Sequence, residues 1–388
     1  MNNIFVNNIV ETLKNFLKKV DKPIPLHEPE FTGKENFYLK KCIESTFVSS
    51  VGKFIDLFEK KIKKITKSKH AIAVVNGTSA IHIGLKLMGV KINDEVLVPT
   101  LTFVSPVNAT IYLGAIPHFV DSDYETFGVN PKKLNDYLKS NTILKNGKCI
   151  NKKTNREIKA LIVVHIFGHP ANIDELKKIS TNFNIPILED AAEGIGSFYN
   201  NKHVGTFGKI GAISFNGNKT ITTGGGGVIL TNDEIMAKRA KHITTTAKLP
   251  HRWEYHFSEV GYNYRMPNLN AALGLAQLEN LPKFLSKKRK LFKKYVEIFK
   301  KIKGITIKKE PTGCKSNYWL QTLMIDEKNK HHKDILLEIT NKNKIMTRPC
   351  WKPMHQLEHF KDFPRMDLSV AEDLYSRLIN LPSSSNLI

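Results

Sequence analysis

Two residues at the ends of predicted buried strands could do chemistry together. Asp190 follows the apolar segment 185–188, and Lys219 follows the apolar segment 210–215 and precedes the glycine run 224–227. A lysine amine can form a Schiff base with a carbonyl group, and a buried carboxylate can keep a pyridine nitrogen protonated. Pyridoxal phosphate (PLP) is a cofactor that needs both groups. The pair therefore predicts a PLP site.

A polar stretch near residue 78 could bind an anion. Gly77-Thr78-Ser79 follows the apolar segment 71–75 and precedes an apolar helix that extends to about residue 88. Free backbone N–H groups at a helix start attract an anion, and two hydroxyl groups add hydrogen-bond donors. A Ser or Thr at this place is more often a plain helix N-cap. The phosphate interpretation therefore depends on the combination with Lys219.

These residues need a scaffold that brings distant strand ends together. Apolar strand-like segments alternate with helical segments from about 71 to 230, which predicts a mostly parallel sheet with helices on both faces. Ligands of such sheets bind beyond the carboxyl ends of the strands. Four candidate residues each follow a predicted strand: Thr78, Phe103, Asp190 and Lys219. We expect one shared site, although Asp190 could instead cap the next helix and Phe103 could be a core aromatic.

The sequence around Lys219 resembles a known family. Residues 189–193 read E-D-A-A-E, and residues 205–227 fit the pattern G-T-F-G-x-x-G-x-x-S-F-N-G-N-K-x-I-T-T-G-x-G-G. This pattern is similar to that of the DegT/DnrJ/EryC1/StrS sugar aminotransferases, and the resemblance spans roughly residues 24–388. It implies a PLP-dependent transaminase in which Lys219 binds the cofactor and moves protons between cofactor and substrate. A dehydratase branch of the family has histidine at this position, so Lys219 favours transamination.

The resemblance also implies a set of cofactor contacts. Asp190 would pair with the ring nitrogen, Glu193 would approach the ring hydroxyl, and Phe103 would stack on the ring. Ser214 would bind the phosphate, together with the helix start at Gly77-Thr78-Ser79. Asn263 would reach the phosphate in the site of a partner subunit. The resemblance therefore implies a homodimer with shared active sites.

The expected architecture is the α/β fold of PLP enzymes of fold type I, which is aspartate-aminotransferase-like. The resemblance implies a large PLP-binding domain with a mostly parallel sheet over residues 24–264 and a smaller C-terminal α+β domain over residues 265–388. Apolar residues at helical spacing predict an amphipathic N-terminal helix within residues 1–23. We expect this helix to dock on the body or on a dimer partner. Asn146-Gly147 between β-prone flanks predicts a type I′ hairpin.

Finer detail points to one branch of the family. The stretches that resemble aminotransferases of legionaminic-acid-type pathways include 25–29, 47–53, 244–248 and 261–268. Such enzymes move an amino group from L-glutamate to C4 of a UDP- or GDP-linked 4-keto-6-deoxy-N-acetylhexosamine, in bacterial surface-sugar biosynthesis of the legionaminic-acid or bacillosamine type. Tyr318, Trp351 and His355 lie in stretches that face the substrate in this family. A perosamine-type or 3-keto nucleotide-sugar aminotransferase is the alternative. Many members of the family have a glutamate at the position of Gly225, so the sequence departs from the family pattern there.

Two other nucleotide-binding motifs do not fit the sequence. A P-loop requires G-x-x-x-x-G-K-[ST], but Asn218 separates Gly217 from Lys219. The glycines at 224–227 follow a lysine loop and lead into a strand, whereas a dinucleotide-binding fingerprint leads from a strand into a helix. We therefore reject both motifs.

Two histidines four residues apart suggest a metal site. His165 and His169 would share one face of a helix, but Gly168 and Pro170 interrupt any helix there. No cysteine or carboxylate completes the ligand set. We therefore expect no metal.

The net charge of the chain is strongly basic. Lys and Arg number 59 against 36 Asp and Glu, which gives +23 at neutral pH. A basic balance is typical of proteins that bind nucleic acid or anionic membranes. Here lysine greatly outnumbers arginine, the lysines are spread along the whole chain, and no nucleic-acid-reading motif accompanies them. Nucleic-acid binding is therefore a distant alternative, and the charge also suits an anionic nucleotide-sugar.

The cellular location is predicted from three features. The sequence contains no run of about 18 apolar residues, so no transmembrane helix is predicted. The N-terminus lacks a basic region followed by an apolar core, so it does not predict a secretory signal. The cysteines, without C-x-x-C spacing, are typical of reduced thiols; they are Cys42, Cys149, Cys314 and Cys350. We expect a cytoplasmic protein.

Overall fold

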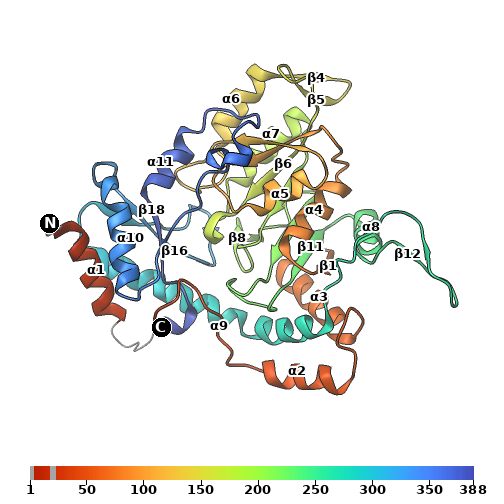
Figure 1. The fold of residues 1–388 in the computed structure, drawn as a ribbon, viewed down its shortest axis with the longest axis horizontal. Coiled ribbons are helices and arrows are strands. Elements are labelled where there is room, and N and C mark those ends of the chain that lie inside the picture. Colours follow the sequence, from red (N-terminus) through yellow and green to blue (C-terminus); the bar gives the residue numbers. More distant parts are fainter. Residues whose placement is uncertain (1–3, 18–22) are drawn as a thin grey trace.

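A mostly parallel sheet forms the centre of the large domain (Figure 1). The computed structural model describes residues 4–17 and 23–388. The strands of this sheet run in the order β1 (His70–Val74), β11 (Gly227–Thr231), β10 (Ile210–Ser214), β7 (Ile187–Asp190), β6 (Ile158–Val164), β2 (Glu95–Pro99) and β3 (Ile116–Val120). Strand β11 is antiparallel to both of its neighbours, and the other pairs are parallel. The α/β class and the mostly parallel sheet expected from the sequence are confirmed.

Helices cover both faces of this sheet. Alternate residues of β1 join different buried apolar clusters: Ile72 and Val74 belong to one, and Ala71 and Ala73 belong to the other. Strands β2, β10 and β11 are buried at every position, as expected for a sheet that is covered on both sides. The helices in this part of the chain are α2 (Glu35–Glu44), α3 (Lys53–Thr66), α4 (Gly77–Leu87), α5 (Ser105–Ile111), α6 (Pro131–Asn141), α7 (Ile173–Phe183) and α8 (Glu234–Thr244).

Smaller strand pairs decorate the large domain. Strands β4 (Thr142–Lys145) and β5 (Lys148–Asn151) form a hairpin in which Asn146 and Gly147 have φ angles of 51° and 73°. Two consecutive positive φ angles are what a type I′ turn requires, so the predicted hairpin is confirmed. A second hairpin pairs β12 (Lys248–Leu249) with β13 (His256–Phe257) and extends from the body at the right of Figure 1. We call residues 248–260 the arm.

The C-terminal part of the chain forms a second, antiparallel sheet. Helix α9 (Asn268–Phe299) contacts α2 and α3 and continues into this second domain. The strand order of the sheet is β14 (Ile305–Ile307), β16 (Gln321–Ile325), β18 (Leu378–Leu381) and β17 (Arg348–Pro349), accompanied by helices α10 (Lys333–Lys342) and α11 (Ser369–Arg377). Strand β15 (Cys314–Lys315) instead pairs with β8 (Phe198–Tyr199), which also pairs with β9 (Lys202–His203). The smaller α+β domain expected from the sequence is therefore present.

The N-terminal helix α1 (Ile4–Leu17) packs on the second domain. Its residues Val6, Ile9 and Leu13 are fully buried in a cluster that contains Tyr295 of α9. Residues 1–3 and 18–22 of the predicted N-terminal extension lie outside the described residues. Among the described residues, no helix has both the length and the apolar character to cross a membrane. The boundaries predicted at residues 23 and 264 remain predictions.

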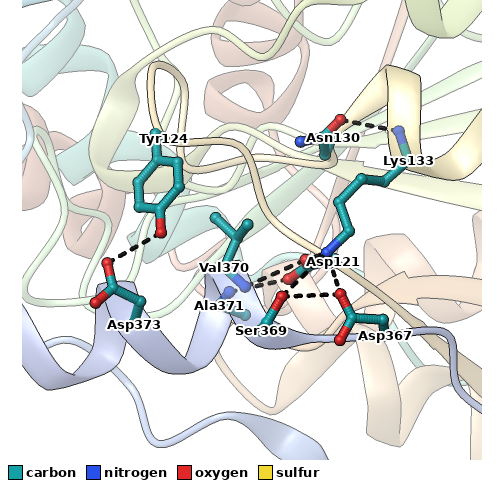
Figure 2. A network of polar contacts seen from close by, with 9 residues as sticks. All are labelled: Asp121, Tyr124, Asn130, Lys133, Asp367, Ser369, Val370, Ala371 and Asp373. Atoms are coloured by element: carbon teal, nitrogen blue, oxygen red, sulfur yellow. Dashed lines mark hydrogen bonds and ion pairs between the residues drawn. The ribbon is translucent and has the colours of Figure 1, made fainter.

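A buried carboxylate joins the two domains (Figure 2). Asp121 follows β3, is 1% exposed, and accepts the backbone N–H groups of Val370 and Ala371 at the start of α11. Lys133 of α6 pairs with Asp121 and with Asp367 on the other side of the junction. Because an anion at a helix N-terminus is stabilised by the unpaired N–H groups, this contact fixes α11 against the end of β3.

Candidate active site

A cavity of about 210 Å³ lies beyond the carboxyl ends of the central strands. It is lined from four strand ends by Gly77 and Thr78 after β1, Phe103 after β2, Asp190 at the end of β7 and Ser214 at the end of β10. Glu193, Lys219 and Trp351 line it as well. The structure thus brings together the residues that the strand-end argument predicted, at the place where parallel sheets bind ligands.

The start of α4 forms one wall of the cavity. Asn76 caps the helix, because its side chain accepts the backbone N–H of Ser79 at 2.8 Å. Thr78 Oγ1 donates to Ser105 Oγ at 2.9 Å, and a Cβ on Gly77 would lie 2.9 Å from Cβ of Ser214. A larger residue than glycine would therefore push the helix start away from Ser214. Hydroxyl groups and the positive helix end together can bind a phosphate group.

Asp190 lines the same cavity at the end of β7. It is 5% exposed, and its Oδ1 accepts the backbone N–H of Ala192 at 3.0 Å. Burial raises the pKa of its carboxyl group, and the positive charge of Lys219 offsets part of this effect. The neighbouring Glu189 is bound by His165 Nε2 at 3.0 Å and by the backbone N–H groups of residues 205, 207 and 208. A cation placed next to Asp190 would favour its ionised form.

Lys219 and Glu193 meet at the base of the cavity. Lys219 Nζ lies 3.4 Å from Glu193 Oε1, and the two side chains are 13% and 6% exposed. Glu193 Oε2 accepts the backbone N–H of Phe167 at 2.8 Å. Burial raises the pKa of Glu193 to about 7 although the nearby Lys219 acts in the opposite direction. Glu193 can therefore gain or lose a proton near neutral pH beside the amine.

Aromatic side chains complete the lining. Phe103 presents 54% of its surface, so its ring is free to contact a planar ligand. Trp351 stacks on Phe167 with ring centroids 5.0 Å apart. Trp319 also lines the cavity, and the sequence reasoning missed it. It follows an irregular segment of the second domain rather than a parallel strand, so the strand-end signal could not find it.

Thr102 is a further lining residue that the sequence reasoning missed. Its hydroxyl group is buried and has no hydrogen-bond partner, and the residue is 1% exposed. An unpartnered buried hydroxyl group beside a cavity is a place for a polar ligand atom. Thr102 lies between the end of β2 and Phe103, so its place after a strand was a signal that could have found it.

Four candidate residues do not line the cavity in this chain. Ser79 is 6% exposed and serves the helix cap through its N–H group. Tyr318 is buried and stacks on Phe292 at 4.4 Å. His355 is bound by Thr100 and Glu372, at 2.8 and 2.9 Å. Asn263 accepts a hydrogen bond from Arg265 at 3.2 Å, and its role in a partner's site remains a prediction.

The two histidines considered for a metal have separate surroundings. His165 Nε2 contacts Glu189, and its Nδ1 accepts the backbone N–H of Ala171. His169 has no hydrogen-bond partner on either ring nitrogen and lies edge-on to Tyr318 at 5.5 Å. Burial lowers the pKa of His169 to about 4. His165 is thus engaged in the buried support of Glu189, and His169 is a neutral ring in an aromatic environment.

The cavity fits PLP in its chemistry. A helix start with hydroxyl groups suits the phosphate, the exposed face of Phe103 suits a planar ring, and the buried Asp190 suits a protonated ring nitrogen. Lys219 supplies the amine within the same cavity. The unpartnered hydroxyl group of Thr102 is an additional site for a polar atom of a ligand.

Comparisons with known proteins agree with this chemistry. The profile of the DegT/DnrJ/EryC1/StrS aminotransferase family matches residues 29–388. The GDP-perosamine synthase of Escherichia coli O157:H7 is 38% identical, with 94% of each chain covered. The putative pyridoxal phosphate-dependent aminotransferase EpsN of Bacillus subtilis is 36% identical, with 94% of this chain and 92% of EpsN covered. The structure of Helicobacter pylori PseC, an aminotransferase involved in pseudoaminic acid biosynthesis, superposes with a TM-score of 0.85 at 25% identity, with 95% of each chain covered.

Proposed function

We infer that this chain, which belongs to the DegT/DnrJ/EryC1/StrS aminotransferase family, moves an amino group from L-glutamate to C4 of a nucleotide-linked 4-keto-6-deoxy-N-acetylhexosamine. It is a PLP-dependent transaminase by its family membership. The observation that carries the assignment of residues is the convergence of Lys219 and Asp190 on one cavity, although they lie on different strand ends. The finer substrate assignment rests on the resemblance to legionaminic-acid-type aminotransferases.

The residues of the cavity divide the work of holding the cofactor. PLP, when bound, supplies a carbonyl group that accepts an amine and a ring that takes up electrons. Thr78 and Ser214 would bind its phosphate at the start of α4, and Asp190 would pair with its ring nitrogen. Phe103 would cover one face of the ring and exclude water from it. These proposed roles rest on the family resemblance, and the presence of all four side chains in the lining of one cavity supports them.

Proton movement is assigned to Lys219 and Glu193. A free amine at Lys219 Nζ can take a proton from a substrate carbon and return it to another atom. Glu193 Oε1 lies 3.4 Å from that amine and can accept a proton from it or donate a proton to it. Its Oε2 is fixed by the N–H of Phe167. The carboxyl group thus keeps the amine oriented and can hold its proton between steps.

We propose that the chain acts as a homodimer with shared active sites. The arm carries large exposed apolar side chains, among them Trp253, Tyr255 and Val260 at 69%, 74% and 79% exposure. Exposed apolar groups gathered on a projecting hairpin are typical of an interface. Asn263 follows the arm, which supports its assignment to the partner's phosphate site.

A perosamine-type activity is the second candidate. The 38% identity to GDP-perosamine synthase over 94% of the chain favours a GDP-linked sugar of the perosamine type. The test is incubation of the purified protein with PLP, L-glutamate and either UDP- or GDP-linked 4-keto-6-deoxy sugars, followed by mass spectrometry. Amination of the N-acetylated sugar alone supports the first candidate, and amination of the GDP-linked sugar without an N-acetyl group supports the second. A failure to aminate any 4-keto sugar would refute both.

A further inference from the structure

The indole ring of Trp319 lies against the amine of Lys219. Lys219 Nζ is 4.0 Å from the centre of the ring. Trp319 Nε1 donates a hydrogen bond at 2.7 Å to the carbonyl oxygen of Asn218, the residue before the lysine. Trp319 is 4% exposed and lines the cavity. One side chain of the second domain therefore contacts both the backbone and the amine of the lysine loop.

The amine lies between two partners of different kinds. Glu193 Oε1 is 3.4 Å from Lys219 Nζ, and the ring of Trp319 is its other neighbour. An ammonium group is attracted to the face of an indole ring, and more strongly where water is excluded. The ring, unlike a carboxylate, cannot take the proton. Trp319 can therefore hold the position of the amine without accepting its proton.

Trp319 is itself anchored to the turn that carries Glu193. Its backbone N–H donates to Asn317 Oδ1 at 2.8 Å, and Asn317 Nδ2 donates to the carbonyl oxygen of Glu193 at 2.7 Å. The buried Lys288 donates to the carbonyl oxygens of Trp319 and Ser383, at 3.0 and 2.7 Å. The ring, the carboxylate and the amine are thus connected through one hydrogen-bonded segment, which fixes their relative positions.

We propose that Trp319 is a positioning residue that holds the free amine of Lys219 beside Glu193 during turnover. This inference rests on the proposed transaminase function. With the cofactor bound, the amine of Lys219 would have to be free to move a proton at the substrate carbon in both half-reactions. A flexible lysine side chain would otherwise leave the reactive geometry, and loss of orientation lowers the rate of the chemical step.

Two substitutions separate the contributions of the ring and its N–H group. Trp319→Phe keeps an aromatic face and loses the hydrogen bond to Asn218, whereas Trp319→Leu loses both. We expect kcat to fall by about tenfold or more in Trp319→Leu and by less in Trp319→Phe, with KM for L-glutamate within about twofold of the original value. Leu320→Ala is the matched control, because it removes a neighbouring buried side chain that does not line the cavity. It should lower the melting temperature but leave kcat nearly unchanged.

A second readout uses the cofactor-free protein. With Trp253 and Trp351 replaced by Phe, the remaining tryptophan fluorescence comes from Trp319, because the chain contains 3 tryptophans. Lys219→Met should change the intensity of this emission, and the surface substitution Lys209→Met should not. Identical emission with and without the Lys219 amine, or an unchanged kcat in Trp319→Leu, would overturn the proposal. If the unsubstituted protein binds no PLP, the transaminase function fails, while the fluorescence still reports the contact.

Discussion

Oε1 of Glu193 and Nζ of Lys219 lie 3.4 Å apart in a site that admits little water. The pair links the candidate nucleophilic amine to a buried carboxyl group. Burial raises the pKa of this carboxyl group to about 7. A raised carboxyl pKa means that the folded protein binds a proton that the unfolded chain has already released. Glu193 therefore reduces the free energy of unfolding as pH rises from about 4.5 to about 7.

Glu193→Gln should remove this pH dependence. The amide oxygen can still accept the N–H of Phe167, so we expect the cofactor-free variant to be about 1 to 3 kcal/mol more stable than the original protein at pH 8 and nearly equal at pH 4.5. Urea unfolding at both pH values measures this difference. Glu175→Gln on the exposed side of α7 is the control and should leave both values unchanged. A variant that is equally stable at pH 8 would contradict the assignment.

Asp121→Ala should weaken the junction of the two domains. The substitution leaves the N–H groups of Val370 and Ala371 without their carboxylate and removes the buried partner of Lys133. We expect a loss of about 2 to 4 kcal/mol in the free energy of unfolding, measured by urea titration. Asp136→Ala, on the exposed side of α6, should cost less than about 0.5 kcal/mol. Equal losses for the two variants would mean that Figure 2 does not show a stabilising contact.

Replacement of Trp253 and Tyr255 by Ser should weaken the proposed homodimer. These side chains are exposed on the arm, and a second copy would cover them. We expect the original protein to elute as a dimer in size-exclusion chromatography with light scattering, and the double variant to dissociate at concentrations about a hundredfold higher. Ile235→Ser removes an equally exposed apolar side chain of α8, outside the arm, and should not change the mass. A monomeric original protein would refute the dimer.

The sequence allowed prediction of those parts of the site that depend on strand order. Thr78, Phe103, Asp190 and Lys219 lie at or after the ends of strands of one mostly parallel sheet, and the carboxyl ends of its parallel strands must meet at one edge. The hairpin at Asn146 and Gly147 was predictable for a similar reason, because two residues fix the turn type. In these cases local pattern and sheet geometry determine where a side chain lies.

The contributions of the second domain could not be predicted in this way. Tyr318 and Trp319 are adjacent, yet Trp319 lines the cavity and Tyr318 stacks on Phe292 in the core. Which of two neighbouring aromatic residues faces the site depends on how the two domains pack, and no local spacing records it. The need for glycine at position 168 also depends on how the two domains pack. A Cβ at Gly168 would lie 1.9 Å from Asn317 Oδ1 of the second domain. His355 is bound between Thr100 and Glu372, and its predicted place near the substrate remains a prediction.

The absorbance spectrum of the purified protein with PLP, before and after L-glutamate, tests the central claim most directly. We predict a band at the edge of the visible region that disappears when L-glutamate is added, because the amine of Lys219 binds the cofactor and glutamate displaces it. Lys219→Ala should show neither the lysine-dependent band nor this response. A protein that stays colourless with PLP, or a band that Lys219→Ala retains with the same response to glutamate, would contradict the assignment of Lys219 as the catalytic amine.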